Sequence, residues 1–243
     1  MASTAELYVA PEIDDLSAYL EHIVSEIAKD AIRVNGRFSL ALSGGSLPKI
    51  LSLKLKDNKE LDFNKWHVFF ADERCVPLDS EDSNYKLTKE ELLIHVPIPS
   101  NQVYTIEESF NDEPRKAAEN YAQQIKSFFG IAHDDIPKFD AIFLGMGPDG
   151  HTCSLFPNHS LINVRDRMIA SITDSPKPPP NRITMTYPIL NSAKNVIFVV
   201  TGEGKADAMH KIFDLKENLP AGLGEFVNSL LFFFFFSLHQ CIS

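Results

Sequence analysis

The sequence predicts an α/β protein built on one doubly wound, mostly parallel sheet with helices on both of its faces. Short apolar runs with the length and composition of buried strands alternate along the chain with segments of helical periodicity. Several of these runs end in turns rich in glycine, serine or charged residues, and ligands bind at the carboxyl ends of strands in open α/β sheets. Because no repeat or linker interrupts the 243 residues, we expect a single domain of this class.

The composition restricts the classes of partner. Hydrophobic residues make up 44% of the chain and charged residues 23%, as in ordinary globular proteins. The net charge of −10 argues against nucleic acid or an anionic membrane as the main partner, but it does not exclude a small anionic substrate. The three cysteines, Cys75, Cys153 and Cys241, are widely spaced, which indicates neither a disulfide framework nor a zinc site and favours a reducing compartment. The chain does not begin with a secretory signal pattern, so we expect a cytosolic protein.

A first helix and a candidate phosphate site occupy the amino-terminal part. Apolar residues at helical spacing predict a helix over 13–34. A buried strand is expected over 38–42 and a second helix over 47–55, joined by the turn Ser43, Gly44, Gly45 and Ser46. Backbone N–H groups at a helix amino terminus favour an anion, so this turn is a candidate phosphate cradle. The alternative is a plain helix cap in which Ser43 or Ser46 satisfies the helix.

Charged residues follow the next strand. Residues 66–70 predict a buried strand that ends in Ala71, Asp72, Glu73 and Arg74. Three charges directly after a strand favour a binding or catalytic site over a merely solvated loop. Beyond them we expect helices over 83–94 and 114–129 and a strand over 103–106.

The central stretch is FDAIFLGMGPDGHTCSLFP, residues 139–157. Its apolar start predicts a strand buried on both faces, and a glycine-rich turn follows it. Asp149 and His151 stand two residues apart in this turn, and Ser154 follows closely enough to help start a helix. A histidine beside a carboxylate at the mouth of a sheet is suited to general base catalysis, although the same residues also make an ordinary structural turn.

The same turn also fits a dinucleotide-binding fingerprint, with Gly145, Gly147 and Gly150 at the required spacing. Pro148 removes a backbone N–H from the loop that would grip pyrophosphate, and Asp149 adds a negative charge beside it. We therefore favour the catalytic loop over a dinucleotide site.

Two segments with cations lie in the last third of the chain, where strands are expected over 168–172, 182–187 and 195–200. The run DSPKPPPN at 174–181 cannot be an interior strand or helix. It is either a stiff surface connector or a rigid rim that aims Lys177 or Arg182 inward. A helix is expected from Ala206, and a cation at a helix start is unfavourable unless an anion binds there, which makes Lys205 a candidate ligand.

Five motifs in this order and spacing carry a resemblance. They are LSGGS at 42–46, ADER at 71–74, GMGPDGHTCSLFP at 145–157, SPKPPPNR at 175–182 and TGEGKA at 201–206. Over about 7–221 the chain closely resembles the 6-phosphogluconolactonase family of the animal type. That family is similar to glucosamine-6-phosphate deaminase and shares its NagB/RpiA/CoA-transferase-like sheet. The resemblance implies hydrolysis of 6-phospho-D-glucono-1,5-lactone to 6-phospho-D-gluconate in the oxidative pentose phosphate pathway, without a metal or organic cofactor.

The resemblance also implies roles for the candidate residues. His151 is expected to be the general base toward water, and Asp149 to orient it or to hold a substrate hydroxyl. Arg74 is expected to serve either the oxyanion or the phosphate. The phosphate is expected to bind the 43–46 turn together with Arg182 and Lys205.

Two alternatives to a lactonase stay open. The deaminase relatives carry a glutamate five residues after the loop histidine, and this chain has Phe156 there, which favours hydrolysis over a sugar-phosphate isomerase or deaminase. The other alternative is a non-catalytic sugar-phosphate-binding chain, because the resemblance ends after Ala221.

The carboxyl-terminal residues look like an alternative terminus. We expect a lactonase domain over 1–221, without the carboxyl-terminal strand and helix of the family, and a divergent apolar tail over 222–243. The apolar run 230–236 has seven residues, far short of the ~20 that span a bilayer. We expect a monomer whose sheet lacks an edge strand and its covering helix, with low stability, a tendency to aggregate, and solubility that improves on trimming after Ala221.

Overall fold

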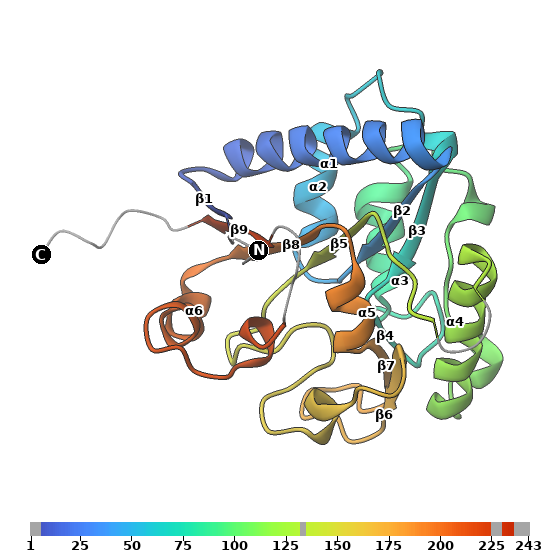
Figure 1. The fold of residues 1–243 in the computed structure, drawn as a ribbon, viewed down its shortest axis with the longest axis vertical. Helices are drawn as coiled ribbons and strands as arrows, with labels where there is room; N and C mark the ends of the chain where they lie inside the picture. The colour runs from blue at the N-terminus through green and yellow to red at the C-terminus, as the bar shows by residue number, and fades with distance from the viewer. Residues whose placement is uncertain (1–5, 132–134, 225–229, 236–243) are drawn as a thin grey trace, which may run out of the picture.

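The computed structural model describes residues 6–131, 135–224 and 230–235 (Figure 1). Its centre is a six-stranded sheet in which every neighbouring pair of strands is parallel. In sheet order the strands are β1 (Glu6–Ala10), β9 (Leu230–Phe235), β8 (Val196–Thr201), β5 (Ala141–Leu144), β2 (Phe38–Leu42) and β3 (Trp66–Phe70). The predicted doubly wound, mostly parallel sheet is confirmed.

Helices cover both faces of this sheet (Figure 1). Two of them, α1 and α2, pack on one face, and α4, α5 and α6 pack on the other. The helices are α1 (Ile13–Asn35), α2 (Leu47–Leu55), α3 (Asn84–Thr88), α4 (Pro114–Phe129), α5 (Tyr187–Ser192) and α6 (Ala206–Phe213). A π-helical turn, Lys89–Leu93, extends α3, and short 3₁₀ helices lie at Phe63–Lys65, Ser100–Gln102, Glu108–Phe110, Ser160–Asn163, Glu203–Lys205 and Pro220–Gly222.

The strands are uninterrupted apolar runs because helices bury them from both sides. In β5, Ala141 and Phe143 join the core under α1 and α2, whereas Ile142 and Leu144 join the core under α4, α5 and α6. Successive side chains of a strand point to opposite faces, so a strand covered on both faces needs apolar residues at every position. The strands predicted over 38–42, 66–70 and 195–200 follow the same rule and are confirmed.

A second, three-stranded antiparallel sheet lies beside the first. Its strands, in order, are β4 (Asp72–Arg74), β7 (Arg182–Met185) and β6 (Ile169–Ile172). The sequence predicts strands at 168–172 and 182–187 but assigns them to the single parallel sheet. Antiparallel and parallel pairing use the same apolar residues, so composition alone does not separate a second sheet from the first.

The pairing of β9 differs from the expectation for the tail. The sequence predicts a sheet that lacks this strand, with an edge strand formed by the apolar run as the alternative. In the structure, residues 230–235 lie between β1 and β8 and pair in parallel with both, so the strand is present and is not at an edge. An interior parallel strand requires a short run of apolar residues of high β-propensity, and LLFFFF meets that requirement without matching the family pattern. The expected loss of a covering helix falls on 236–243, outside the described residues.

Two local predictions are wrong. Residues 103–106 form no strand, and only a single bridge joins Val103 to Val68. No helix starts at Ser154, because Thr152 and Leu155 close a tight turn there. Within the described ranges, no helix is long and apolar enough to cross a membrane.

Candidate active site

A cavity of about 280 Å³ opens at the carboxyl edge of the six-stranded sheet. It lies beyond β2 and β5, where the strand order reverses, since β3 follows β2 on one side while β8 follows β5 on the other. In doubly wound sheets this reversal leaves a crevice between loops that diverge, and ligands bind in it. The loops after β2, β3, β5 and β8 all contribute to the cavity wall.

The loop after β5 places His151 in this cavity. Two hydrogen bonds within the loop stabilise its turn. The Gly147 N–H donates to the His151 carbonyl at 2.8 Å, and the Thr152 hydroxyl donates to the Gly145 carbonyl at 2.9 Å. A Cβ on Gly147 would lie 1.9 Å from His151 Nδ1 and 2.6 Å from Asp149 Oδ1. Only glycine therefore allows the histidine and the carboxylate to fold back over the loop backbone.

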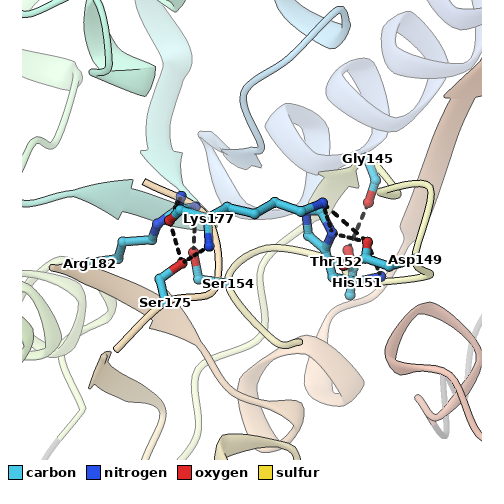
Figure 2. Close-up of polar contacts among 8 residues, drawn as sticks. All are labelled: Gly145, Asp149, His151, Thr152, Ser154, Ser175, Lys177 and Arg182. Carbon is cyan, nitrogen blue, oxygen red and sulfur yellow. Dashed lines mark hydrogen bonds and ion pairs between the residues drawn. The ribbon is translucent and has the colours of Figure 1, made fainter. Parts of the chain in front are cut away.

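Within this loop His151 and Asp149 form a close pair (Figure 2). His151 Nδ1 lies 2.5 Å from Asp149 Oδ1, so its proton points at the carboxylate and Nε2 carries the free lone pair. Lys177 extends from the proline-rich segment to this pair, with Nζ 3.3 Å from Asp149 Oδ1 and 3.1 Å from His151 Nδ1. The alternative that the sequence left open is thus decided in favour of Lys177 as the residue that points inward.

Burial, aided by the charge of Lys177, keeps the histidine neutral. Burial lowers the pKa of His151, the Asp149 carboxylate raises it, and the Lys177 ammonium lowers it again, with a net lowering from 6.5. Burial raises the pKa of Asp149, but the hydrogen bond and charge of His151 and the charge of Lys177 outweigh it and lower this pKa to about 2. At neutral pH the pair is therefore a neutral imidazole held by an ionised carboxylate, which is the state that a general base requires.

The serine–glycine turn forms the opposite wall. Ser43, Gly44 and Gly45 line the cavity at the amino end of α2, where the first N–H groups of a helix have no partner within the helix. The buried Ser43 hydroxyl makes no hydrogen bond to nitrogen or oxygen within the described residues and interacts only with the Cys153 thiol. Ser46, which the sequence also predicts as a phosphate ligand, does not line the cavity. Its hydroxyl lies 3.2 Å from the Thr201 hydroxyl instead.

Strand β4, which follows β3, adds the carboxylate of Asp72 to the cavity wall. The sequence predicts a charged site at this position but does not identify Asp72 as a candidate site residue. Asp72 is 4% exposed, lines the cavity, and accepts a hydrogen bond from the Ser154 hydroxyl at 2.8 Å. Asn84 donates to the Asp72 carbonyl at 2.9 Å. A Cβ on Gly44 would lie 2.0 Å from Asn84 Oδ1, so glycine is needed there for this wall to approach the serine–glycine turn.

The Glu73 side chain connects β4 to the start of α3 by hydrogen bonds. Its carboxylate accepts hydrogen bonds at 2.8 Å from the backbone N–H groups of Arg74, Asn84 and Tyr85. Burial raises the pKa of Glu73, these N–H groups oppose the shift, and the result is about 7. Glu73 is thus a buried cap of the helix and does not line the cavity.

Two of the three predicted cations line the cavity. Arg74 donates from Nη1 to the Asp82 carbonyl at 3.0 Å, and its buried Nε has no partner within the described residues. Lys205 precedes α6, and burial together with the charge of Lys177 lowers its pKa. Arg182 does not line the cavity, because its guanidinium is 3% exposed and bonds to backbone carbonyls of the proline-rich segment. The prediction that Arg182 is a direct phosphate ligand therefore disagrees with its position.

Cys153 also lines the cavity but is unsuited to be a nucleophile. Burial raises the pKa of its thiol well above its usual value, and the Asp72 carboxylate acts in the same direction. The thiolate, which is the reactive form, is thus disfavoured. Among the described residues no group of three or more histidine, cysteine, aspartate or glutamate side chains is arranged to hold a metal ion.

Comparison with known proteins places these features in a family. A family model described as glucosamine-6-phosphate isomerases/6-phosphogluconolactonase matches residues 11–228. The proteins named 6-phosphogluconolactonase of Rattus norvegicus and Homo sapiens are each 45% identical to the chain, and each alignment covers 86% of this chain and 82% of the relative. The crystal structure of the 6-phosphogluconolactonase from Thermotoga maritima is 28% identical, with a TM-score of 0.80 over 95% of this chain and 100% of that one.

Proposed function

The chain belongs to the family of glucosamine-6-phosphate isomerases and 6-phosphogluconolactonases, and we propose that it hydrolyses 6-phospho-D-glucono-1,5-lactone to 6-phospho-D-gluconate. This reaction is the second step of the oxidative pentose phosphate pathway. The observation that carries the proposal is the neutral His151 held by Asp149 in a cavity with cations on its wall. The names of the relatives support the same reaction.

The reaction begins with water. His151 Nε2 accepts a proton from water as the water oxygen bonds to C1 of the lactone, and Asp149 stabilises the imidazolium through Nδ1–H. The tetrahedral intermediate then collapses, the bond between C1 and the ring oxygen breaks, and His151 returns the proton to that oxygen. The products are a carboxylic acid at C1, which releases its proton to solvent and becomes a carboxylate at neutral pH, and a hydroxyl at C5. His151 is returned to its neutral state, and water is the only other reactant consumed.

Cations and N–H groups on the cavity wall stabilise the negative charges of the substrate phosphate and of the oxyanion. Lys177 lies next to the base, so it stabilises the oxyanion that forms at C1. Gly44 and Gly45 at the start of α2, with Ser43 and Lys205, form the phosphate site. Arg74, whose buried Nε is unpaired, adds a third charge to the wall.

Phe156 favours hydrolysis over isomerisation. Its ring is 1% exposed and lies 4.8 Å from the His151 ring, centroid to centroid. Isomerases and deaminases move protons between carbon and the ring oxygen, which requires further acid and base groups, and an apolar ring supplies none. Specific assays separate the alternatives. A deaminase releases ammonia from glucosamine 6-phosphate, an isomerase interconverts aldose and ketose phosphates without releasing ammonia, and a binding chain converts nothing.

The direct test uses the purified chain and freshly prepared 6-phosphogluconolactone. Formation of 6-phosphogluconate is followed by its coupled oxidation, and the spontaneous hydrolysis of the lactone is subtracted. We expect a protein-dependent rate that is proportional to protein concentration. A rate equal to spontaneous hydrolysis, with 6-phosphogluconate still bound, would assign the chain to the non-catalytic alternative.

Loss of the Lys205 charge should weaken phosphate recognition. In the variant Lys205→Ala we expect the affinity for 6-phosphogluconate to fall roughly ten- to hundredfold, as for a desolvated charge-assisted contact of about 1.5–3 kcal/mol. Calorimetric titration measures this loss. Lys211→Ala, on the helix that follows Lys205, is the matched control, because Lys211 pairs with Asp207. If both variants bind 6-phosphogluconate like the parent chain, Lys205 is not a phosphate ligand.

The pH dependence of kcat/KM should report the titration of His151. The base must be neutral, and because the pKa of His151 is lowered from 6.5, we expect a plateau through neutral pH. Activity should then be lost at a lower pH, by about tenfold for each pH unit below the pKa of His151. Histidine NMR titration on the same samples identifies the group. An acid limb centred above pH 6.5 would contradict the assignment.

We also propose a cytosolic monomer that acts without a metal or organic cofactor. Both described cysteines, Cys75 and Cys153, are unpaired, as is usual in a reducing compartment. Light scattering coupled to size-exclusion chromatography tests the oligomeric state.

A further inference from the structure

We propose that Arg182 is a positioning residue that holds the segment 175–181 so that Lys177 reaches the His151–Asp149 pair, and that Arg182 does not itself bind phosphate. We call the segment 175–181 the proline strap. The inference concerns the lactonase site and so rests on the proposed function.

The guanidinium of Arg182 binds three consecutive carbonyls of the proline strap. Nε donates to the Pro179 carbonyl at 2.9 Å, and Nη2 donates to the carbonyls of Lys177 at 2.8 Å and Pro178 at 2.9 Å. Proline has no backbone N–H, so residues 178–180 cannot donate the hydrogen bonds that normally stabilise a turn, although the Pro180 carbonyl accepts one from the Ser175 N–H. The donors for the carbonyls of Lys177, Pro178 and Pro179 come instead from the Arg182 side chain.

Arg182 is itself on a rigid support. It begins β7, where it lies opposite Arg74 of β4 and Ile172 of β6. The strap is also held from within, because the hydroxyl of Ser175, its first residue, donates to the Lys177 carbonyl at 2.8 Å (Figure 2). The Lys177 carbonyl therefore accepts hydrogen bonds from both Arg182 and Ser175, which fixes the backbone from which the Lys177 side chain extends.

The same guanidinium also contacts the loop that carries the general base. Nη1 lies 3.4 Å from the Ser154 hydroxyl, which in turn donates to Asp72. The guanidinium carbon lies 5.7 Å from the centre of the Phe156 ring, and that ring packs against His151. Arg182 therefore connects the strap that carries Lys177 to the loop that carries His151, and fixes one relative to the other.

The remaining capacity of Arg182 is too small for a phosphate. An arginine side chain has five N–H donors, and the contacts to Pro179, Lys177, Pro178 and Ser154 use four of them. Tight phosphate binding by arginine uses two parallel N–H groups. Arg182 has one donor left and is 3% exposed.

The test is a double-mutant cycle of Arg182→Lys and Lys177→Ala, with three readouts: lactonase kcat/KM, affinity for 6-phosphogluconate, and the NMR titration of His151. We expect Arg182→Lys to lower kcat/KM by about 10²-fold, the scale of a misplaced catalytic group, and Lys177→Ala to do the same. Because both variants remove the same contact, the double variant should be no worse than the more damaging single one.

The pKa of His151, measured by NMR titration, reports the position of Lys177 independently of catalysis. The groups that face His151 are Asp149, Lys177 and Asp72, and of these only Lys177 lowers the pKa of His151. Withdrawal of Lys177 should therefore raise this pKa in both single variants, in the same direction, with no further rise in the double variant. Arg167→Lys is the matched control, because Arg167 is exposed and pairs only with Asp166 among the described residues.

Two results would overturn the inference. One is losses in kcat/KM that multiply in the double variant, and the other is an Arg182→Lys variant that loses as much 6-phosphogluconate affinity as Lys205→Ala while the pKa of His151 is unchanged. If Arg182→Lys does not fold, Ser175→Ala removes the hydrogen bond from the Ser175 hydroxyl to the Lys177 carbonyl within the strap. An unchanged pKa of His151 in that variant would contradict the inference. Absence of lactonase activity in the parent chain refutes the proposed function instead, and the NMR titration then still tests the strap.

Discussion

Replacing His151 with alanine is expected to lower turnover of 6-phosphogluconolactone by about 10²–10⁴-fold, the usual effect of losing a positioned acid or base. The imidazole that accepts the proton of water is removed, while the cations and N–H groups that hold the phosphate remain. The affinity for 6-phosphogluconate should therefore change little. Steady-state kinetics with the coupled assay, together with calorimetric titration of 6-phosphogluconate, measure the two quantities separately.

The control for this variant is His210→Ala. His210 lies on the exposed side of α6 and pairs with Asp214, away from the cavity, so its loss should leave both turnover and binding unchanged. Near-normal turnover in His151→Ala would rule out His151 as the base. A fall in 6-phosphogluconate affinity as large as the fall in turnover would show that His151 mainly binds the substrate.

Removing β9 is expected to unfold the protein or to leave it largely insoluble. A chain that ends at Gly224 lacks the strand between β1 and β8, so β1 loses its only partner strand within the described residues and β8 becomes an open edge. Loss of an interior strand should cost several kcal/mol, a large part of the 5–15 kcal/mol that stabilises a typical domain. Urea unfolding followed by circular dichroism measures the change.

A single substitution separates the role of the strand from that of the rest of the tail. Phe233→Pro removes an N–H from β9 in a strand with neighbours on both sides, and we expect it to be nearly as damaging as the truncation. Phe233→Val keeps the backbone N–H and the β-propensity, and is expected to be much milder. A truncated chain that is more soluble and melts at the same temperature as the full chain would contradict this role of β9 and agree with the sequence-based expectation that trimming the tail improves solubility.

The class of fold and the central part of the site can be predicted from the amino-acid sequence alone. Apolar runs of strand length alternate with amphipathic segments, and this pattern depends only on which residues are buried, so the parallel sheet and its two helical layers follow from it. The loop of Asp149 and His151 was also identifiable, because both residues lie in one short turn. Their contact is local, and the glycines between β5 and His151 permit the tight turn that brings the two side chains together.

Which distant residues reach the cavity depends on how the chain packs in three dimensions. The sequence could not distinguish Lys177 from Arg182, since both flank the same prolines, and the structure shows Lys177 at the base while Arg182 is buried beneath the strap. Asp72 lies 82 residues from Ser154 in the chain, and their hydrogen bond has no local signature.

The place of residues 230–235 between β1 and β8 was likewise beyond a local reading. Periodicity and propensity report how one segment is buried, whereas strand order and side-chain direction depend on which segments pack together.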